Sequence, residues 1–184
     1  MAEPSPLLAP LKPTLVAPRL WRVGGFVADD WRVLADDEAI PPDGRILLPL
    51  ARWRQEKASL AARDVPLGVR VQPPEEVDPE TDDIAQLQVI ALVFPKFSDG
   101  RAYSMARRLR ERGYTGEIRA TGDVLLDQLP LMLRAGFDSF EIVHAATIRA
   151  LERNGFPAIA HIYQATAEPT AVDWKRRRSA ISWG

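Results

Sequence analysis

The sequence predicts an α/β fold in which repeated strand–helix units form a mostly parallel sheet, either open or an incomplete barrel, with a small N-terminal hairpin. Apolar, strand-like runs alternate with helical patterns from about residue 46 onward, and each unit takes roughly 20–29 residues. This alternation is typical of βα units around a parallel sheet. We count about six units. A closed barrel of the usual size needs about eight, so the sheet is expected to stay open or to close only in part.

Short-range patterns place the individual elements. Strands are expected at 46–49, 67–71, 88–94, 117–121, 139–143 and 158–163, and helices at 51–63, 79–87, 101–112, 124–135 and 145–154. In the helix at 101–112, apolar residues recur at i, i+3, i+4 and i+7 from Ala102, and Gly113 suits the position just past its end. Pro130 is tolerated only in a first turn, which predicts a tight turn at 123–126 and a helix from about Asp127.

The N-terminal part has a different character. Five prolines within residues 1–20 predict a flexible extended arm. Two short apolar runs between residues 25 and 34, on either side of Asp29-Asp30, predict the hairpin. The expected organisation is therefore the arm at 1–20, a single α/β domain at 21–165, and a basic C-terminal tail at 166–184.

Composition excludes several classes of function. The chain has 184 residues and a net charge of −1, so no global field favours nucleic acid or an anionic membrane. It lacks an apolar stretch of membrane-spanning length and a secretory leader pattern, so we expect a cytoplasmic location and no membrane partner. With no cysteine, the chain offers no thiolate nucleophile, disulfide or cysteine-ligated cluster, and with only two histidines a histidine-rich metal site is not expected. The sequence specifies no cofactor.

Polar residues gather where the predicted strands end. Because the carboxyl ends of parallel strands share one edge of a sheet, the loops after 88–94 and 117–121 are expected to lie together. We predict an anion site there, followed by a helix N-terminus, with Asp99 and Asp123 as candidate acid–base groups. The candidate anion-binding residues are Lys96, Ser98, Gly100, Arg101, Arg119 and Gly122. If Arg119 faces inward it needs a carboxylate partner, for which Asp123 and Asp99 are the candidates.

Each of these residues also has a purely structural interpretation. Ser98 and Asp99 suit the capping of the following helix, and Gly122-Asp123 suits a turn. Lys96 and Arg101 suit solvated charges or simple ion pairs. His144 and His161 are expected to be packing residues rather than ligands or bases.

One long stretch resembles a known family. The segments from Phe94 to Tyr114, from Gly116 to Leu129 and from Gly136 to Phe140, with the earlier Asp29-Asp30-Trp31, look like the bacterial family called domain of unknown function 934. The resemblance covers roughly residues 22–163. In contrast with the usual family pattern, Pro130 replaces a larger apolar or aromatic residue, and Ala135 stands where a cysteine often occurs.

The resemblance implies a link to assimilatory sulfite reduction, because members are described as oxidoreductases of that process on the basis of neighbouring genes. It supplies no catalytic residues. Our first hypothesis is an accessory protein or oxidoreductase component that acts on sulfite reductase by docking or electron-transfer coupling, with an oxyanion-binding loop at 94–101. The alternative is a small α/β enzyme that binds an oxyanion or phosphorylated metabolite, with Asp99 or Asp123 as acid or base. A flavin-binding subunit is a third interpretation.

Overall fold

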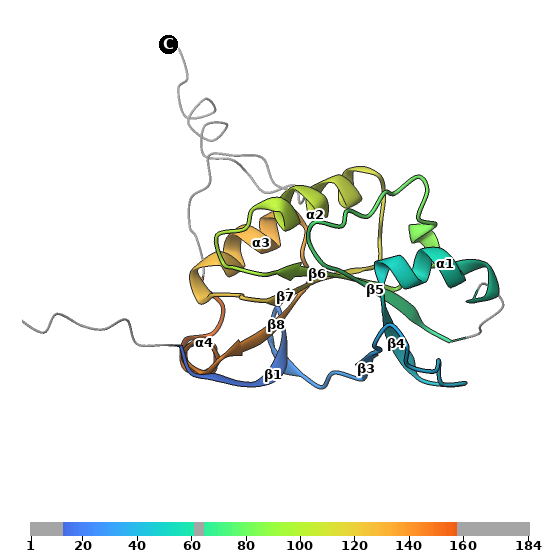
Figure 1. The fold of residues 1–184 in the computed structure, drawn as a ribbon. Helices are drawn as coiled ribbons and strands as arrows, with labels where there is room; N and C mark the ends of the chain where they lie inside the picture. The colour runs from blue at the N-terminus through green and yellow to red at the C-terminus, as the bar shows by residue number, and fades with distance from the viewer. Residues whose placement is uncertain (1–12, 61–64, 158–184) are drawn as a thin grey trace, which may run out of the picture.

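A mixed sheet with helices on one face forms the body of the protein (Figure 1). The computed structural model describes residues 13–60 and 65–157. Over these residues the strands follow the order β2-β1-β8-β7-β6-β5-β4-β3. The strands are β1 Leu15–Arg22, β2 Gly25–Val27, β3 Trp31–Val33, β4 Arg45–Pro49, β5 Leu67–Val71, β6 Val89–Phe94, β7 Glu117–Gly122 and β8 Ser139–His144. The helices are α1 Leu50–Leu60, α2 Arg101–Glu111, α3 Leu129–Ala135 and α4 Ala145–Asn154, with short 3₁₀ turns η1 Ile84–Gln86 and η2 Leu126–Gln128.

The predicted fold class is confirmed. Strands β3 to β8 are parallel to one another, and β1 runs antiparallel to both of its neighbours, β2 and β8. The predicted strands from 46 to 143 all form, to within a residue or so at their ends. Helices connect β4 to β5, β6 to β7 and β7 to β8, as is usual for parallel crossovers, and the crossover from β5 to β6 contains only the turn η1. The sheet is therefore mostly parallel, with an antiparallel addition from the N-terminal segment.

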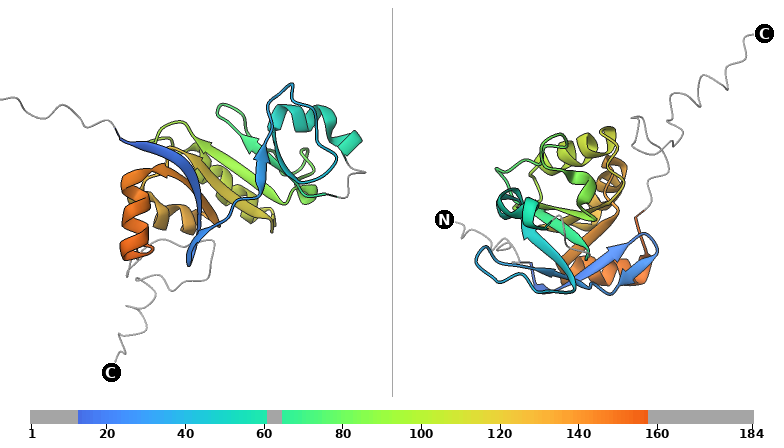
Figure 2. Two further views of the ribbon diagram at one scale, coloured as in Figure 1. Left: turned by 90° about the horizontal axis from the view of Figure 1, so that it is seen from below. Right: turned by 90° about the vertical axis from the view of Figure 1, so that its right-hand side faces the viewer.

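The sheet curls into a half-barrel. Strands β2 and β3 are consecutive in the chain, yet they form the two opposite edges of the sheet. Only residues 28–30 connect them, so the Cα atoms of Val27 and Trp31 lie at most about 14 Å apart. A flat sheet of this width could not meet that limit. The end-on view in Figure 2 shows the N-terminal strands passing beneath the rest of the sheet.

The hairpin exists, but not where the sequence predicts it. Strands β1 and β2 pair around Val23-Gly24, with Leu20 opposite Val27 and Arg22 opposite Gly25. Gly24 has φ 111°, a conformation that suits glycine in a tight turn. The two apolar runs on either side of Asp29-Asp30 do not pair with each other, because they end up at opposite edges of the sheet.

The predicted arm also ends earlier than expected. Residues 15–20, assigned to the arm because of the five prolines within 1–20, belong to β1, which pairs with β8. The register of this pairing shifts between Leu15 and Arg19, and Pro18 falls in that irregularity. A proline, which has no N–H to donate, is tolerated there because the hydrogen-bond ladder is interrupted at this point.

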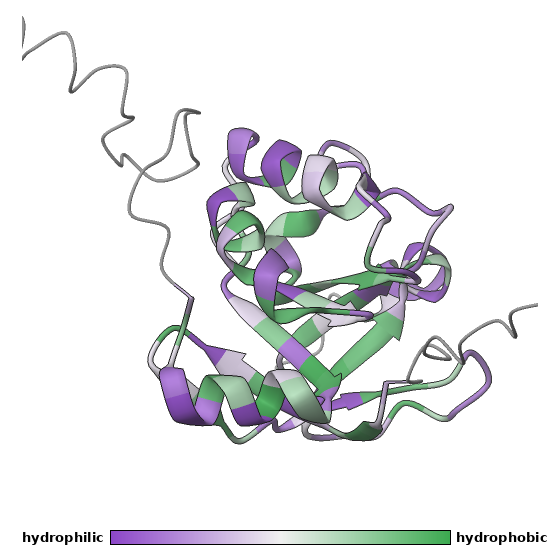
Figure 3. Ribbon diagram, turned by 90° about the vertical axis from the view of Figure 1, so that its left-hand side faces the viewer, coloured by the Kyte–Doolittle hydropathy of each residue, from purple (hydrophilic) through white to green (hydrophobic). Residues whose placement is uncertain are grey.

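Strand residues alternate between two differently packed faces of the sheet. On β6, Ile90, Leu92 and Phe94 join the main core beneath the helices, while Val89 and Ala91 face the inside of the curl. We call these the helix face and the inner face. On α2 the predicted apolar residues Ala102, Met105, Ala106 and Leu109 are buried. Figure 3 shows hydrophobic strands beneath helices whose outer turns are hydrophilic.

Two predicted helices differ from the structure. Residues 79–87 form only the turn η1, because the buried Asp82 carboxylate accepts the Asp78 N–H and two hydrogen bonds from Arg54, which hold the segment as a compact loop. The helix after β7 begins at Leu129, slightly later than predicted, with Pro130 in its first turn as expected.

Several expected features lie outside the described residues, namely the strand at 158–163, the tail at 166–184, His161 and most of the arm. Within residues 13–60 and 65–157, no helix combines the length and apolarity needed to cross a membrane.

Candidate functional site

Three neighbouring parallel strands end at the same edge of the sheet and bring most of the predicted site residues there. Strand β7 pairs with β6 on one side and β8 on the other, and the strands end at Phe94, Gly122 and His144. The loop 95–100, Asp123 and His144 therefore lie at the carboxyl edge, where α/β proteins usually bind their ligands.

Asp123 is the centre of this edge. Its Oδ1 lies 2.7 Å from His144 Nε2, and its Oδ2 accepts the Phe97 N–H at 2.9 Å. Its own N–H donates to the Phe94 carbonyl at 2.9 Å. One residue thus connects the ends of all three strands.

The Asp123–His144 contact has the chemistry of an acid–base pair. The carboxylate fixes the imidazole through Nε2, which leaves Nδ1 as the second ring nitrogen for proton transfer. The His144 side chain is 8% exposed, and that of Asp123 is 30% exposed. Sequence reasoning placed both residues at this edge but assigned His144 to packing, because nothing in the sequence indicates which side chains turn toward each other.

Gly122 makes a close backbone approach, but to the protein itself. Its φ is 91°, and a Cβ atom at this position would lie 2.4 Å from the carbonyl oxygen of Phe94. Gly122 therefore allows β7 to lie against the end of β6 and to turn into Asp123. Gly100, the other glycine among the candidate anion-binding residues, has φ −84° and open space around it.

Asp99 and Arg101 pair with each other at the start of α2. The Asp99 carboxylate accepts the Arg101 backbone N–H at 3.1 Å, and the Arg101 guanidinium donates to both carboxylate oxygens, the shortest contact being 2.6 Å. Hydrogen bonds from this guanidinium and from the Arg101 backbone N–H lower the pKa of Asp99 to about 2. Asp99 is therefore ionised at neutral pH and is poorly suited to donate a proton.

Two backbone N–H groups of the loop 95–100 also donate hydrogen bonds within the protein. The Asp99 N–H donates to the Lys96 carbonyl, and the Phe97 N–H donates to Asp123. The Lys96 and Ser98 side chains are exposed. Among the described residues, Lys96 has no ion-pair partner, so it is the cation of this loop that is available to an anion.

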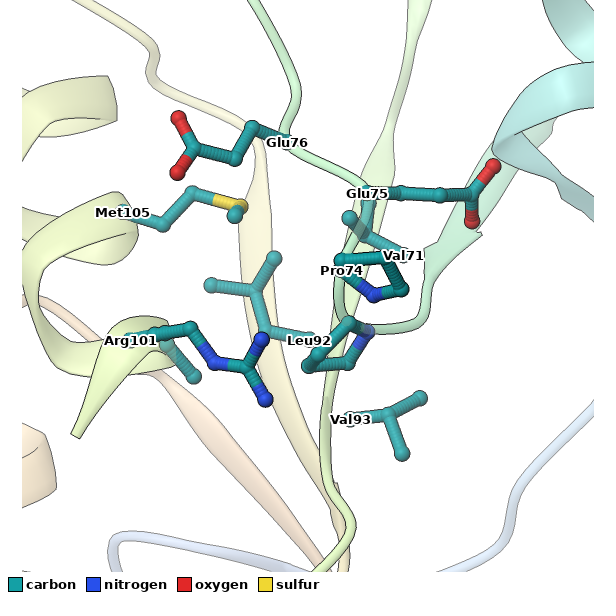
Figure 4. A pocket seen from close by; sticks show the side chains of 10 residues that line it. Val71, Pro74, Glu75, Glu76, Leu92, Val93, Arg101 and Met105 are labelled. Atoms are coloured by element: carbon teal, nitrogen blue, oxygen red, sulfur yellow. The ribbon is translucent and has the colours of Figure 1, made fainter. Parts of the chain in front are cut away.

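A narrow, mainly apolar pocket lies beside this loop, between the chain after β5 and the start of α2 (Figure 4). Its walls include Val71, Leu92 and Met105. The Arg101 side chain projects toward the side of the pocket that Pro74 lines, whereas the Glu75 carboxylate points away from it. With a volume of about 10 Å³, the pocket holds roughly one water molecule.

Arg119 does not belong to the loop cluster. It lies on the inner face and is fully buried, and its partners are Asp29 and Glu117 rather than Asp123 or Asp99. Glu117 lies two residues away on the same strand, while Asp29 reaches Arg119 from the connection between the sheet edges. Within the described residues, no group of three or more histidine, aspartate or glutamate side chains has the arrangement of a metal site.

The fold and this edge define a class: a curled, mostly parallel α/β protein with an Asp–His pair and a loop lysine at the carboxyl ends of its strands. The chain belongs to the family described as "Bacterial protein of unknown function (DUF934)", whose model matches residues 68–174. The resemblance inferred from the sequence is thereby confirmed at the level of the family. No curated protein and no solved structure matches the chain.

Proposed function

We propose that this protein is an accessory component of assimilatory sulfite reduction that works by binding, to the reductase or to its oxyanion substrate. The observation that carries the proposal is membership of the DUF934 family, together with the sulfite-reduction link that the resemblance implies. Because the chain contains no cysteine, it brings no thiol and no cysteine-ligated cluster of its own to a redox reaction. A supporting role beside a redox enzyme fits this composition better than an independent reductase does.

Growth on defined sulfur sources tests this proposal. A deletion strain should grow poorly with sulfate or sulfite but normally with sulfide or cysteine, and the intact gene should restore growth. The tagged protein should also recover assimilatory sulfite reductase from the same cells. Normal growth on every sulfur source, together with no recovered reductase, would refute the proposal.

The second candidate is a small α/β enzyme that acts on an oxyanion or phosphorylated metabolite. The 2.7 Å contact between Asp123 and His144 favours it, since a carboxylate-oriented imidazole is a common general base. In this candidate Asp123 orients His144, Lys96 holds the anionic group, and Asp99 remains paired with Arg101.

Thermal-shift screening tests the anion site that the enzyme candidate requires. Sulfite, sulfate, phosphate and nucleotides should include a compound that stabilises the wild type, and Lys96→Ala should reduce that response. Arg107→Ala, on the exposed face of α2, is the control. Responses that are unchanged in Lys96→Ala would exclude the enzyme candidate at this loop.

A further inference from the structure

Arg119 carries a positive charge into the interior of the half-barrel. Its side chain is 1% exposed. Nε donates to Glu117 at 3.0 Å and Nη1 donates to Asp29 at 2.8 Å. The remaining nitrogen, Nη2, is sealed from solvent and has no hydrogen-bond partner among the described residues. A buried N–H of a charged group without a partner lowers the stability of the folded protein, so a function is a reason for keeping it.

Asp29 is the carboxylate that balances this charge. Glu117 is shared, because it also accepts hydrogen bonds from Ser139 Oγ and from Arg22. At the outer end of the guanidinium, Asp29 contacts Nη1 alone. An arginine fork offers two parallel N–H groups to an oxyanion, and Asp29 uses one of them.

A second unpartnered group lies on the same strand and the same face of the sheet. Thr121 is two residues from Arg119 on β7, so both side chains lie on the inner face. Thr121 is buried, and its hydroxyl has no hydrogen-bond partner among the described residues. Within residues 13–60 and 65–157, the inner face of β7 therefore holds two buried donors without a hydrogen-bond partner.

The Asp29 carboxylate is held weakly enough to move away from Arg119. Asp29 belongs to the connection 28–30 between β2 and β3, which has no regular secondary structure. Its side chain is 30% exposed, and among the described residues its other oxygen accepts a single, long hydrogen bond of 3.3 Å from the Trp31 N–H. The neighbouring Glu141 interacts electrostatically with Arg119, Arg70 and Asp29, and burial raises its pKa.

We propose that Arg119 and Thr121 form a binding site for a small oxyanion of the sulfite, sulfate or phosphate class, and that Asp29 occupies this site as an internal stand-in. The anion takes the place of the Asp29 carboxylate, contacts Nη1, Nη2 and the Thr121 hydroxyl, and releases the connection between the sheet edges. This site is separate from the loop 95–100 and does not depend on the proposed function.

Chemical rescue tests the site. Asp29→Ala should lower the melting temperature, and sulfate, sulfite or phosphate should restore it more than sodium chloride of equal ionic strength does. Asp30→Ala is the matched control, because Asp30 lies in the same connection and is mostly exposed. It also measures the general stabilisation that sulfate and phosphate give to any protein. The double variant Asp29→Ala/Arg119→Gln should lose the extra response.

The outcome is decisive in either direction. The site is supported if the oxyanion response of Asp29→Ala exceeds that of Asp30→Ala and disappears with Arg119. It is overturned if the two single variants respond alike, or if the double variant retains the response.

A second measurement covers the case in which Asp29→Ala does not fold. Trp31 packs against Leu47, Val89 and Ala91 on the inner face, two residues from Asp29. Comparison with Trp31→Phe identifies the part of the tryptophan emission that comes from Trp31. In the wild type, oxyanion binding should change this part of the emission. In Asp29→Asn, the same change should occur at an oxyanion concentration about tenfold lower. Emission that is insensitive to oxyanions in both proteins would overturn the proposal.

Discussion

Asp123 and His144 lie 21 positions apart in the chain, yet Oδ1 and Nε2 are 2.7 Å apart at the ends of adjacent strands. With the Phe97 N–H on its other oxygen, Asp123 joins the ends of β6, β7 and β8 into one polar unit. Because this polar unit joins three strand ends, it contributes to stability. Its contribution to the free energy of unfolding can be measured without knowing a substrate.

A double-mutant cycle should reveal this unit. Asp123→Ala and His144→Ala are each expected to lower the free energy of unfolding by about 1–3 kcal/mol, because each leaves a partly buried polar partner unpaired. The double variant should cost less than the sum by about 0.5 kcal/mol or more. Urea denaturation measures all four corners, with Asp127→Ala as an exposed control. Strictly additive losses would show that the contact is not energetically coupled.

Replacing each of two glycines at the same edge by alanine should change the stability of the protein differently. Gly122→Ala places a methyl group 2.4 Å from the Phe94 carbonyl oxygen at φ 91°, so we expect a loss of about 2 kcal/mol or more. Gly100→Ala has an ordinary φ and free space, and should be neutral or slightly stabilising. Thermal unfolding of both variants checks the contrast. Equal losses would contradict the close approach of β7 to β6.

The Arg54–Asp82 pair should contribute to acid sensitivity. Burial alone would raise the pKa of Asp82, but hydrogen bonds from Arg54 and the Asp78 N–H outweigh it, so the pKa is lowered. A lowered folded-state pKa gives stability that is present above the unfolded value of about 3.9 and is lost as pH falls through the folded value. The wild type should therefore lose stability below about pH 4 more steeply than Asp82→Asn.

At neutral pH, Asp82→Asn should cost about 2 kcal/mol. This is less than the roughly 3–5 kcal/mol of a fully buried pair, because the Arg54 side chain is 41% exposed. Denaturant unfolding between pH 3 and about 7 measures both effects. The exposed Asp37→Asn provides the control, and parallel pH profiles for Asp82→Asn and the wild type would argue against the pair.

The pairing of Asp99 with Arg101 can be observed directly. Replacing Arg101 by Gln removes the guanidinium that lowers the pKa of Asp99, so this pKa should rise from about 2 toward its ordinary value. NMR titration of the side-chain carboxyl carbon reports the change, and Arg107→Gln should leave it unaltered. A pKa that stays near 2 in Arg101→Gln would assign the shift to the backbone N–H alone.

Local patterns predicted the elements of this fold well where the residues themselves carry the signal. The apolar spacing from Ala102 and the position of Pro130 indicated α2 and α3, and alternating runs indicated β4 to β8. Strand β1 was missed because prolines usually exclude a strand interior, whereas Pro18 falls in an irregularity of the ladder. Nor do local patterns show that β2 and β3 take opposite edges, since strand order depends on distant pairing.

For the candidate site, too, some features could be predicted from the sequence and others depend on distant contacts. Parallel topology was enough to bring the loop 95–100, Asp123 and His144 to one edge. The partner of Arg119 was assigned wrongly, because Asp29 is 90 residues away and reaches it only after the sheet has curled. Contacts between side chains on different strands depend on register and curvature, which a single sequence does not display.

The position of β1 and β4 has a consequence for the region that defines the family. The match begins at residue 68, inside β5, and leaves out everything that precedes it. In the folded chain, β4 covers the outer edge of β5 and β1 covers that of β8. A fragment restricted to the matched region would expose both edges to intermolecular strand pairing and invite aggregation. The first third of this chain thus protects the edges of β5 and β8 from intermolecular strand pairing. Expression trials should therefore retain it.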